Sequence, residues 1–335
     1  MRKLLLSLCL LVLPLFAAAQ DREALLTPDG TLFTVSTNLS HIDASAAEGH
    51  LVLRSQRGDE VTSEIVPATL GGGLHAEADM AYDTESQTLF VFWLNYTSVQ
   101  TSHLMFAWRD ANGTWSEAET FGQQFDYHSN LRIAATRKAS EEDGTVGPES
   151  AISVHLVWWE NNTDNEESAQ YAMLALDKGR IESFRRLDLT KFAADAEGDA
   201  LAPDVDRSVL KQPLLFASPQ QDSVLVVFGD PAKEELHQVR VRPTRVVAEG
   251  RLRVPVGRHE RSNRAPSFRV AANSRMEGIA GESSRLALYT RDTGRLQYVI
   301  MKEDGAWSEA RSITLDEQIT SSAAIDALRR LLNEH

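Results

Sequence analysis

The stretch Asn112-Gly113-Thr114-Trp115-Ser116-Glu117-Ala118 decides the fold, because Asp304-Gly305-Ala306-Trp307-Ser308-Glu309-Ala310 repeats it closely. Each copy follows an apolar, alternating run, residues 104–108 in the first and 296–301 in the second. Asn-Gly and Asp-Gly favour the tight turn of a β-hairpin, because both central residues can adopt positive φ. Each copy therefore predicts a strand, a turn and a further strand that begins with tryptophan.

The sequence before each copy predicts two more strands, so that the repeated unit has four. In the first clear unit the upstream strands are residues 75–82 and 88–93, and in the last they are 264–272 and 285–289. Two weaker units lie between them. Their expected strands are 128–136, 152–159, 170–176 and 181–187, then 211–218, 223–228, 237–247 and 251–256.

A partial unit comes first, with expected strands at 31–36, 51–55 and 60–66 and without a clear first strand. The C-terminal segment 320–328 aligns with the first strands of the other units, so it is predicted to close a ring. The alternative is a short helix, which the spacing of Ile325, Leu328, Leu331 and Leu332 favours. The predicted fold is therefore an all-β propeller of five blades, each with four antiparallel strands.

Domain organisation follows from the polar connections. The longest are residues 138–150, 191–207 and 273–284, which are rich in Gly, Asp, Glu and Ser as surface loops are. None of them has the character of an interdomain linker. We therefore expect a signal peptide at 1–19 and one propeller domain at 20–335.

The N-terminus predicts export. Arg2 and Lys3 precede an apolar run that ends at Phe16, and Ala17–Ala19 provide a small-residue cleavage site. Cys9 is the single cysteine and lies inside this segment, so the mature chain has no disulfide, thiol nucleophile or cysteine-bound metal. These features predict a periplasmic or extracellular protein from a bacterium.

Composition excludes one class of partner. The formal net charge is −14, and no run of lysines and arginines is interleaved with aromatic residues. Such a surface repels nucleic acid and anionic lipid. No further apolar run of membrane length follows the signal, so the mature chain is not expected to insert into a membrane.

The turn sequence Asp110-Ala111-Asn112-Gly113-Thr114-Trp115 resembles the Asp-box of sialidase-like (BNR-type) β-propellers, whose pattern is Ser-x-Asp-x-Gly-x-Thr-Trp. Asn112 replaces the glycine of this pattern, and Trp108 replaces the serine. In the second copy Trp307 matches, whereas Lys302 occupies the position of the acid. The resemblance implies that Asp110 caps a turn between the third and fourth strands and that Trp115 packs between blades.

The resemblance also implies what catalysis would require. Sialidases use three arginines, an acid, and a tyrosine nucleophile with a glutamate partner, and an Arg-Ile-Pro string lies near the start of the domain. Here the nearest string is Leu131-Arg132-Ile133-Ala134, which lacks the proline and lies mid-chain. Carboxylate-dependent propeller glycosidases would instead need acids at the starts of the first strands. Glu77 and Asp79, on one face of a strand, are the best candidates for such a pair.

Other chemistry has weaker support. No Gly-x-Ser-x-Gly, His-x-x-x-His or His-Glu-x-x-His string occurs, so neither a serine triad nor a histidine metal site is predicted. Asp204 and Asp206 are a pair that suits calcium, but two acids in a loop are more often only solvated. We expect no cofactor, no metal and no catalytic residue.

The first strands begin with His75, His128, Lys211 and Arg264, and Ser321 would be the fifth equivalent if the C-terminus closes the ring. A basic ring at the mouth of a central channel would attract anions, and an arginine binds a carboxylate with two hydrogen bonds. The leading hypothesis is an exported, non-catalytic propeller that binds a glycan, peptide or protein, with an anionic ligand favoured. The alternatives are a glycoside hydrolase or sialidase-like enzyme, and a structural module of an envelope complex.

Overall fold

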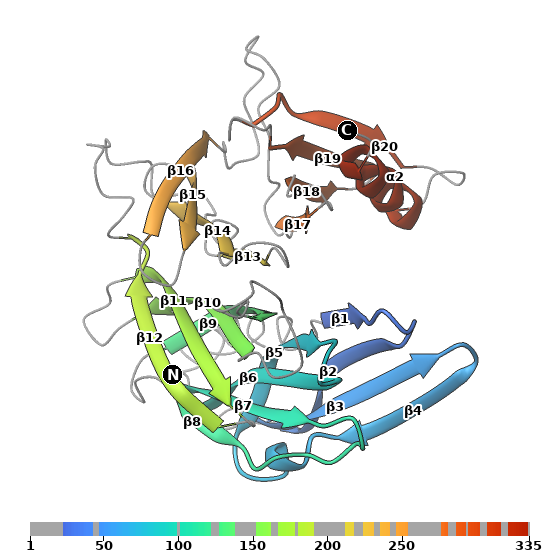
Figure 1. Cartoon of the computed structure of the whole chain (residues 1–335), viewed down its shortest axis with the longest axis vertical. Helices are drawn as coiled ribbons and strands as arrows, with labels where there is room; N and C mark the ends of the chain where they lie inside the picture. The colour runs from blue at the N-terminus through green and yellow to red at the C-terminus, as the bar shows by residue number, and fades with distance from the viewer. Residues whose placement is uncertain are drawn as a thin grey trace, which may run out of the picture. The chain divides into compact units, whose positions relative to one another are not determined.

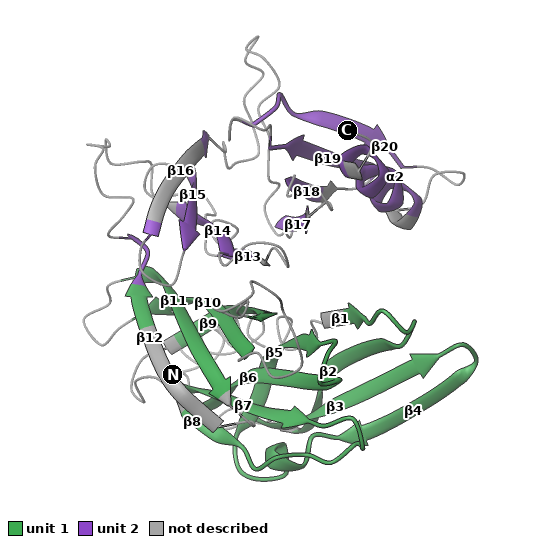
Figure 2. Cartoon of the chain, in the orientation of Figure 1, with its two compact units in different colours: residues 1–187 green, residues 188–335 purple. Residues whose placement is uncertain are grey.

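The computed structural model describes residues 23–42, 47–98, 101–121, 127–137, 152–161, 167–177, 180–190, 212–217, 224–230, 235–241, 246–253, 276–280, 286–292, 294–301, 307–315 and 321–333. The chain forms two compact units, Met1–Leu187 and Asp188–His335, and each is described by itself (Figure 2). The described strands fall into consecutive antiparallel groups of four, so the prediction of an all-β chain built from four-stranded units is confirmed (Figure 1). Closure into a ring of five blades stays a prediction.

The first group contains a strand that the sequence analysis missed. Its strands are β1 (Glu23–Leu26), β2 (Leu32–Ile42), β3 (Ala47–Arg57) and β4 (Glu60–Ile65). β1 pairs with β2, so the expectation that this unit lacks a first strand is wrong. Four residues are too few to show the alternation by which a strand is recognised.

The second group is joined to the first. Its strands are β5 (Leu74–Asp83), β6 (Thr88–Ser98), β7 (Thr101–Arg109) and β8 (Glu119–Phe121), and the short 3-10 helix η1 (Pro67–Thr69) precedes it. One parallel pair, Gly49 with Leu74, connects β3 to β5. The first eight strands are therefore one sheet, where two separate blades were expected.

The third group is a separate sheet and agrees with prediction within a few residues. It has the order β12-β11-β10-β9 and comprises β9 (Tyr127–Arg137), β10 (Ile152–Asn161), β11 (Glu167–Asp177) and β12 (Arg180–Asp188).

Two apolar layers in unit 1 explain why the second strand of a group is apolar throughout. Leu89, Val91 and Trp93 of β6 pack against the first group of strands. The alternate residues Phe90, Phe92 and Leu94 pack against β9–β11. A strand buried on both faces reads as a continuous apolar run.

The Trp-Ser-Glu-Ala repeat makes the same hydrogen bonds in both copies. Ser116 N–H donates to the Trp108 carbonyl at 2.9 Å, and Ser116 Oγ accepts the Trp108 N–H at 3.0 Å. Ser308 has the same two bonds with Ile300, at 2.8 and 3.0 Å. A serine hydroxyl therefore takes the place of a backbone carbonyl where the fourth strand leaves the third.

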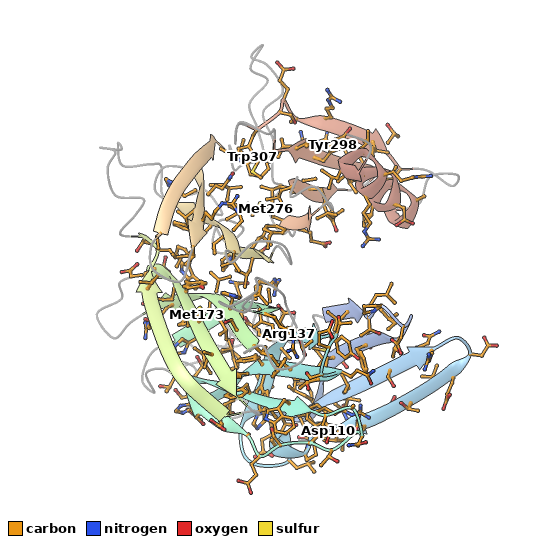
Figure 3. All side chains as sticks on the ribbon, viewed as in Figure 1. Asp110, Arg137, Met173, Met276, Tyr298 and Trp307 are labelled. Atoms are coloured by element: carbon orange, nitrogen blue, oxygen red, sulfur yellow. The ribbon has the colours of Figure 1, made fainter. Side chains whose placement is uncertain are left out.

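The turn before the first copy has the form that the resemblance implies. Asp110 Oδ1 accepts the N–H groups of Asn112 and Thr114 at 2.9 and 2.8 Å (Figure 3). Gly113 has φ 84°, which favours glycine. Trp115 and Trp307 are half-buried, and each packs against the apolar layer between its own group of strands and the preceding one.

Unit 2 contains two sheets and a helix. The first sheet is β13 (Leu214–Ala217), β14 (Val224–Asp230), β15 (Glu235–Val241) and β16 (Val246–Arg253). The second is β17 (Met276–Ala280), β18 (Leu286–Asp292), β19 (Arg295–Ile300) and β20 (Arg311–Thr314), followed by α2 (Ser321–Asn333).

Two strand boundaries in unit 2 correct the sequence analysis. The expected strand 237–247 ends at Val241, and β16 begins at Val246 rather than at 251. Pro243 lies between them in the sequence and has no N–H to donate to a ladder. β17 lies inside the expected loop 273–284, whereas the strand expected at 264–272 lies outside the described residues.

Gly278 explains why β17 was missed. A glycine in the middle of a five-residue segment weakens the strand signal. Here a side chain at position 278 would meet Phe216 of β13 at 2.2 Å, so the glycine allows that ring to approach β17.

The C-terminal segment is the helix α2, so the predicted closing strand is wrong and its helical alternative is confirmed. Ala324, Leu328 and Leu332 are buried at intervals of four residues, against a face of the last sheet that includes Tyr289 and Tyr298. Among the parts of the chain that the structure describes, no helix is long and apolar enough to cross a membrane.

Candidate functional site

The candidate site lies where β5 and β9 begin, because both strands have a bulge at the corresponding place. Glu77 has φ 49° and Asn130 has φ 56°. The pairing register shifts at the same points, between Ala76 and Asp79 and opposite Val157–Trp159. Positive φ is uncommon for residues other than glycine, and bulges often redirect side chains beside active sites. Both backbones are therefore held in an unusual shape here.

Glu77 is the centre of this cluster. Tyr96 of β6 donates its hydroxyl to Glu77 Oε1 at 2.6 Å. The second carboxylate oxygen, Oε2, accepts the N–H of Asn130 through a short hydrogen bond. The Tyr96 hydroxyl also lies 3.2 Å from the carbonyl of His128. Glu77 is half-buried, whereas Tyr96 is buried.

Two further acids of β5 also bind β9. Asp79 Oδ2 accepts the N–H of Ile133 at 2.8 Å. Asp83 accepts two hydrogen bonds from Arg137, one of them Nε to Oδ1 at 2.6 Å (Arg137 is labelled in Figure 3). Burial opposes ionisation of Asp83, but the hydrogen bonds from Arg137 and Ser86 outweigh it and lower the pKa of that carboxyl. Glu77, Asp79 and Asp83 therefore form a carboxylate seam between the two strands.

His75 is an internal group in this structure. It is 2% exposed, and Trp93 donates its indole N–H to His75 Nδ1 at 2.9 Å. The other ring nitrogen, Nε2, lies 3.0 Å from the Gly71 carbonyl, to which it donates in this tautomer. Burial lowers the pKa of His75 below its ordinary value, because a charged imidazole loses its hydration there.

His128 is also internal, with 0% exposure. Ser102 of β7 contacts it twice, since Ser102 Oγ accepts the His128 N–H at 2.8 Å and lies 2.9 Å from Nδ1. Its Nε2 lies 3.3 Å from Glu160 Oε2, just beyond the usual range of an N–H···O hydrogen bond.

Glu160 joins His128 to the opposite edge of the sheet. Trp158 Nε1 donates to Glu160 Oε2 at 3.1 Å, and Arg186 of β12 makes a short ion pair with Oε1. Burial opposes ionisation of Glu160, but the interactions with His128, Trp158 and Arg186 lower its pKa overall. Arg186 also donates to Gln170 at 3.0 Å, and its guanidinium carbon lies 5.6 Å from the centre of the Trp158 ring.

Two residues of the predicted basic ring, His75 and His128, lie among the described residues. His75 and His128 do occupy corresponding positions, and each lies beside a tryptophan of the next strand at ring-centre distances of 6.2 and 6.3 Å. Lys211, Arg264, Asp204 and Asp206 lie outside the described residues. Ser321 begins α2, so it is not a strand residue equivalent to the others.

Glu77 and Asp79 were predicted from the sequence, whereas the residues that contact Glu77 or lie around His128 were not. These are Tyr96, Ser102, Asn130, Glu160 and Arg186. Their partners on other strands lie 16 to 53 residues away, and the bulges are not visible in the residue pattern. A polar residue at the end of an apolar strand, as at Glu160, is the one signal that was available.

Unit 2 contains a second tyrosine–glutamate pair. Tyr289 of β18 donates its hydroxyl to Glu277 of β17 through a short hydrogen bond. Tyr289 is buried in the layer that includes α2. Across the described residues, no three His, Cys, Asp or Glu side chains are grouped as metal ligands.

Comparisons with known proteins find no matching family model and no matching curated protein. Several solved structures are similar. A Hadza microbial sialidase is 12% identical with a TM-score of 0.49, and the match covers 88% of this chain and 58% of the sialidase. An α-L-arabinanase from Penicillium chrysogenum is 11% identical with a TM-score of 0.48, over 89% of this chain and 82% of the enzyme.

The GH43_1 enzyme from Xanthomonas citri, solved with xylotriose, is 10% identical with a TM-score of 0.43, over 90% of this chain and 92% of the enzyme. This chain therefore spans just over half the length of the sialidase and most of the other two.

Proposed function

We propose that this chain is a glycoside hydrolase in which Tyr96 is the nucleophile and Glu77 is its base. The observation that carries the proposal is the 2.6 Å hydrogen bond from the Tyr96 hydroxyl to Glu77, made by a glutamate at φ 49°. Residues in sparsely populated backbone conformations cluster at functional sites. Such a conformation is unfavourable by itself and persists only where the surrounding structure holds it. A half-buried carboxylate that accepts a phenol proton is the arrangement that activates a tyrosine.

The chemistry follows from these two groups. Tyr96 Oη attacks the anomeric carbon of a glycoside, its proton moves to Glu77, and the bond to the leaving oxygen breaks. Water then attacks the same carbon and gives up one proton to solvent, the bond to Tyr96 breaks, and the proton held by Glu77 returns to the Tyr96 phenolate. An aryl leaving group departs as a stable phenolate, so this reaction needs no further acid. A covalent intermediate of this kind retains anomeric configuration.

The non-catalytic hypothesis has less support from the described residues. It assigned ligand binding to His75 and His128, whose side chains are 2% and 0% exposed, less than the 7% of Tyr96. Binding of an anionic ligand by Lys211 and Arg264 remains a proposal, as does a glycan, peptide or protein partner. The positions of His75 and His128 do not support either proposal.

Turnover of aryl glycosides tests the proposed enzyme. The panel comprises aryl α-sialosides, α-L-arabinofuranosides and β-xylosides with purified mature protein. We expect release of the aryl group from at least one of them, and loss of at least about a hundredfold in kcat for Y96F and for E77Q. Y289F is the matched control, because it removes the same hydroxyl–carboxylate bond in unit 2. Unchanged turnover in Y96F would refute the role of Tyr96, and no turnover of any glycoside would refute the function.

A further inference from the structure

We infer that Ser102 and Glu160 are positioning residues that fix the start of β9 through His128, and thereby hold the Glu77–Tyr96 pair. The inference rests on the proposed function for its catalytic consequence, but its structural content can be measured without activity. The segment concerned, residues 128–130, supplies two of the groups that the pair contacts.

The first step is that both members of the pair contact this short segment. Glu77 Oε2 accepts the N–H of Asn130, and the Tyr96 hydroxyl lies 3.2 Å from the His128 carbonyl. A displacement of residues 128–130 would therefore change the direction of the Glu77 carboxylate and the surroundings of the Tyr96 hydroxyl together.

The second step is that the His128 side chain anchors the segment on two sides. Ser102 Oγ accepts the His128 N–H at 2.8 Å, so the serine proton is free to bind Nδ1 at 2.9 Å. That assignment leaves the ring proton on Nε2, which faces the Glu160 carboxylate at 3.3 Å. The imidazole thus has the Ser102 hydroxyl on one side and the Glu160 carboxylate on the other.

The third step is that Glu160 is itself immobilised. The Trp158 indole N–H and the Arg186 guanidinium both bind it, and Gln170 holds Arg186 from the neighbouring strand. The anchors come from β7, β10, β11 and β12, so four strands support one residue of β9. Asn130 keeps its unfavourable φ of 56° because this support leaves the start of the strand no freedom to relax.

The test combines nuclear magnetic resonance with kinetics in the full-length mature protein. S102A removes both serine contacts to His128, and E160Q keeps the size of the side chain while removing its charge. We expect both variants to move the Asn130 amide proton upfield, because its hydrogen bond to Glu77 lengthens. We also expect kcat for an aryl glycoside to fall roughly 10- to 100-fold, with KM changed much less.

The control is T136V, which removes a 2.8 Å contact to His155 at the other end of β9 and should leave the Asn130 amide and kcat unchanged. If S102A does not fold, E160Q decides the question. An Asn130 amide at its wild-type position in both variants overturns the inference. A shifted amide in a chain whose Y96F variant retains activity confirms the positioning and refutes only the proposed function.

Discussion

At the scale of the residue, several buried polar side chains of unit 1 have hydrogen-bond partners within the protein in place of water. His155 shows this most clearly. Its ring lies between the Tyr171 hydroxyl and Thr136 Oγ1, each at 2.8 Å, and burial lowers its pKa to about 4. The folded protein therefore keeps this imidazole neutral at pH values where the unfolded chain protonates it.

The sign of the resulting pH dependence is fixed. The contribution of neutral His155 to the free energy of unfolding is fully present above the pKa of 6.5 that the residue has in the unfolded chain. It is lost as the pH falls toward 4, because the unfolded chain then binds a proton that the folded protein does not. We expect a loss of about 2 kcal/mol between pH 7.5 and pH 5 from this residue. Urea titrations of wild type and H155N at both pH values measure it. A wild-type loss no larger than that of H155N would contradict the assignment.

Asp110 provides a second prediction for a single residue. D110A removes the acceptor of two backbone N–H groups in an exposed turn, so we expect a cost of about 1 kcal/mol in the free energy of unfolding. D110N, which keeps an amide oxygen that can accept the same N–H groups, should reduce the free energy of unfolding by less than D110A. Chemical denaturation of the three proteins checks the order, and equal stability of D110A and wild type would show that the turn does not need the acid.

At the scale of the element, strands with strong local signals were predicted and those defined by distant partners were not. β5, β9, β10 and β11 combine apolar alternation with turn residues, and their bounds lie within three residues of those predicted. β6 begins at the predicted residue, Thr88, but runs to Ser98, five residues beyond its expected end. β1 has four residues and β17 has a glycine at its centre, so neither has a pattern to recognise. The helix α2 has helical spacing in its sequence, and the residues at that spacing, Ala324, Leu328 and Leu332, are the ones buried against the last sheet.

The candidate site was less predictable than the fold for the same reason. Glu77 and Asp79 were identified because acids near the start of an inner strand are unusual. Tyr96, Asn130 and Ser102 were not, because their contacts depend on bulges and on strands that meet only after folding. Sequence periodicity reports which face a residue occupies, but it does not report hydrogen-bond partners across sheets.

The Trp-Ser repeat leads to a prediction for the fourth strands. W115A and W307A should each cost about 2–3 kcal/mol, less than a fully buried ring, because both side chains are half-buried. S116A and S308A should each cost about 1 kcal/mol, since each removes one hydroxyl that accepts a backbone N–H. Thermal melts test all four, and an effect confined to one copy would show that the two copies are not equivalent.

The helix α2 leads to a prediction for unit 2. L328A removes a fully buried side chain from the contact with the last sheet, and we expect a loss of about 2–4 kcal/mol. L331A is the matched control, because Leu331 lies on the same helix with 37% exposure. Equal destabilisation by the two variants would show that the helix does not pack as described.

At the scale of the whole molecule, export is the prediction that lies outside the described residues. If the first 19 residues are a signal peptide, the secreted protein begins at Gln20, whose side chain can cyclise onto its own amino group. Mass spectrometry of the N-terminal peptide from an exported preparation checks this. Recovery of a soluble chain that still begins at Met1 would contradict it.

The carboxylate seam between β5 and β9 has a consequence for how similar repeats recognise their neighbours. Sheets with similar apolar faces could pack against the wrong neighbouring sheet, because apolar contacts have little directional specificity. Three acids on β5 bind two backbone N–H groups and one guanidinium on β9. The acids therefore specify which sheet packs beside β5. If β5 is exchanged for the corresponding strand of another repeat, we expect each sheet to form but the β5 and β9 sheets no longer to pack together.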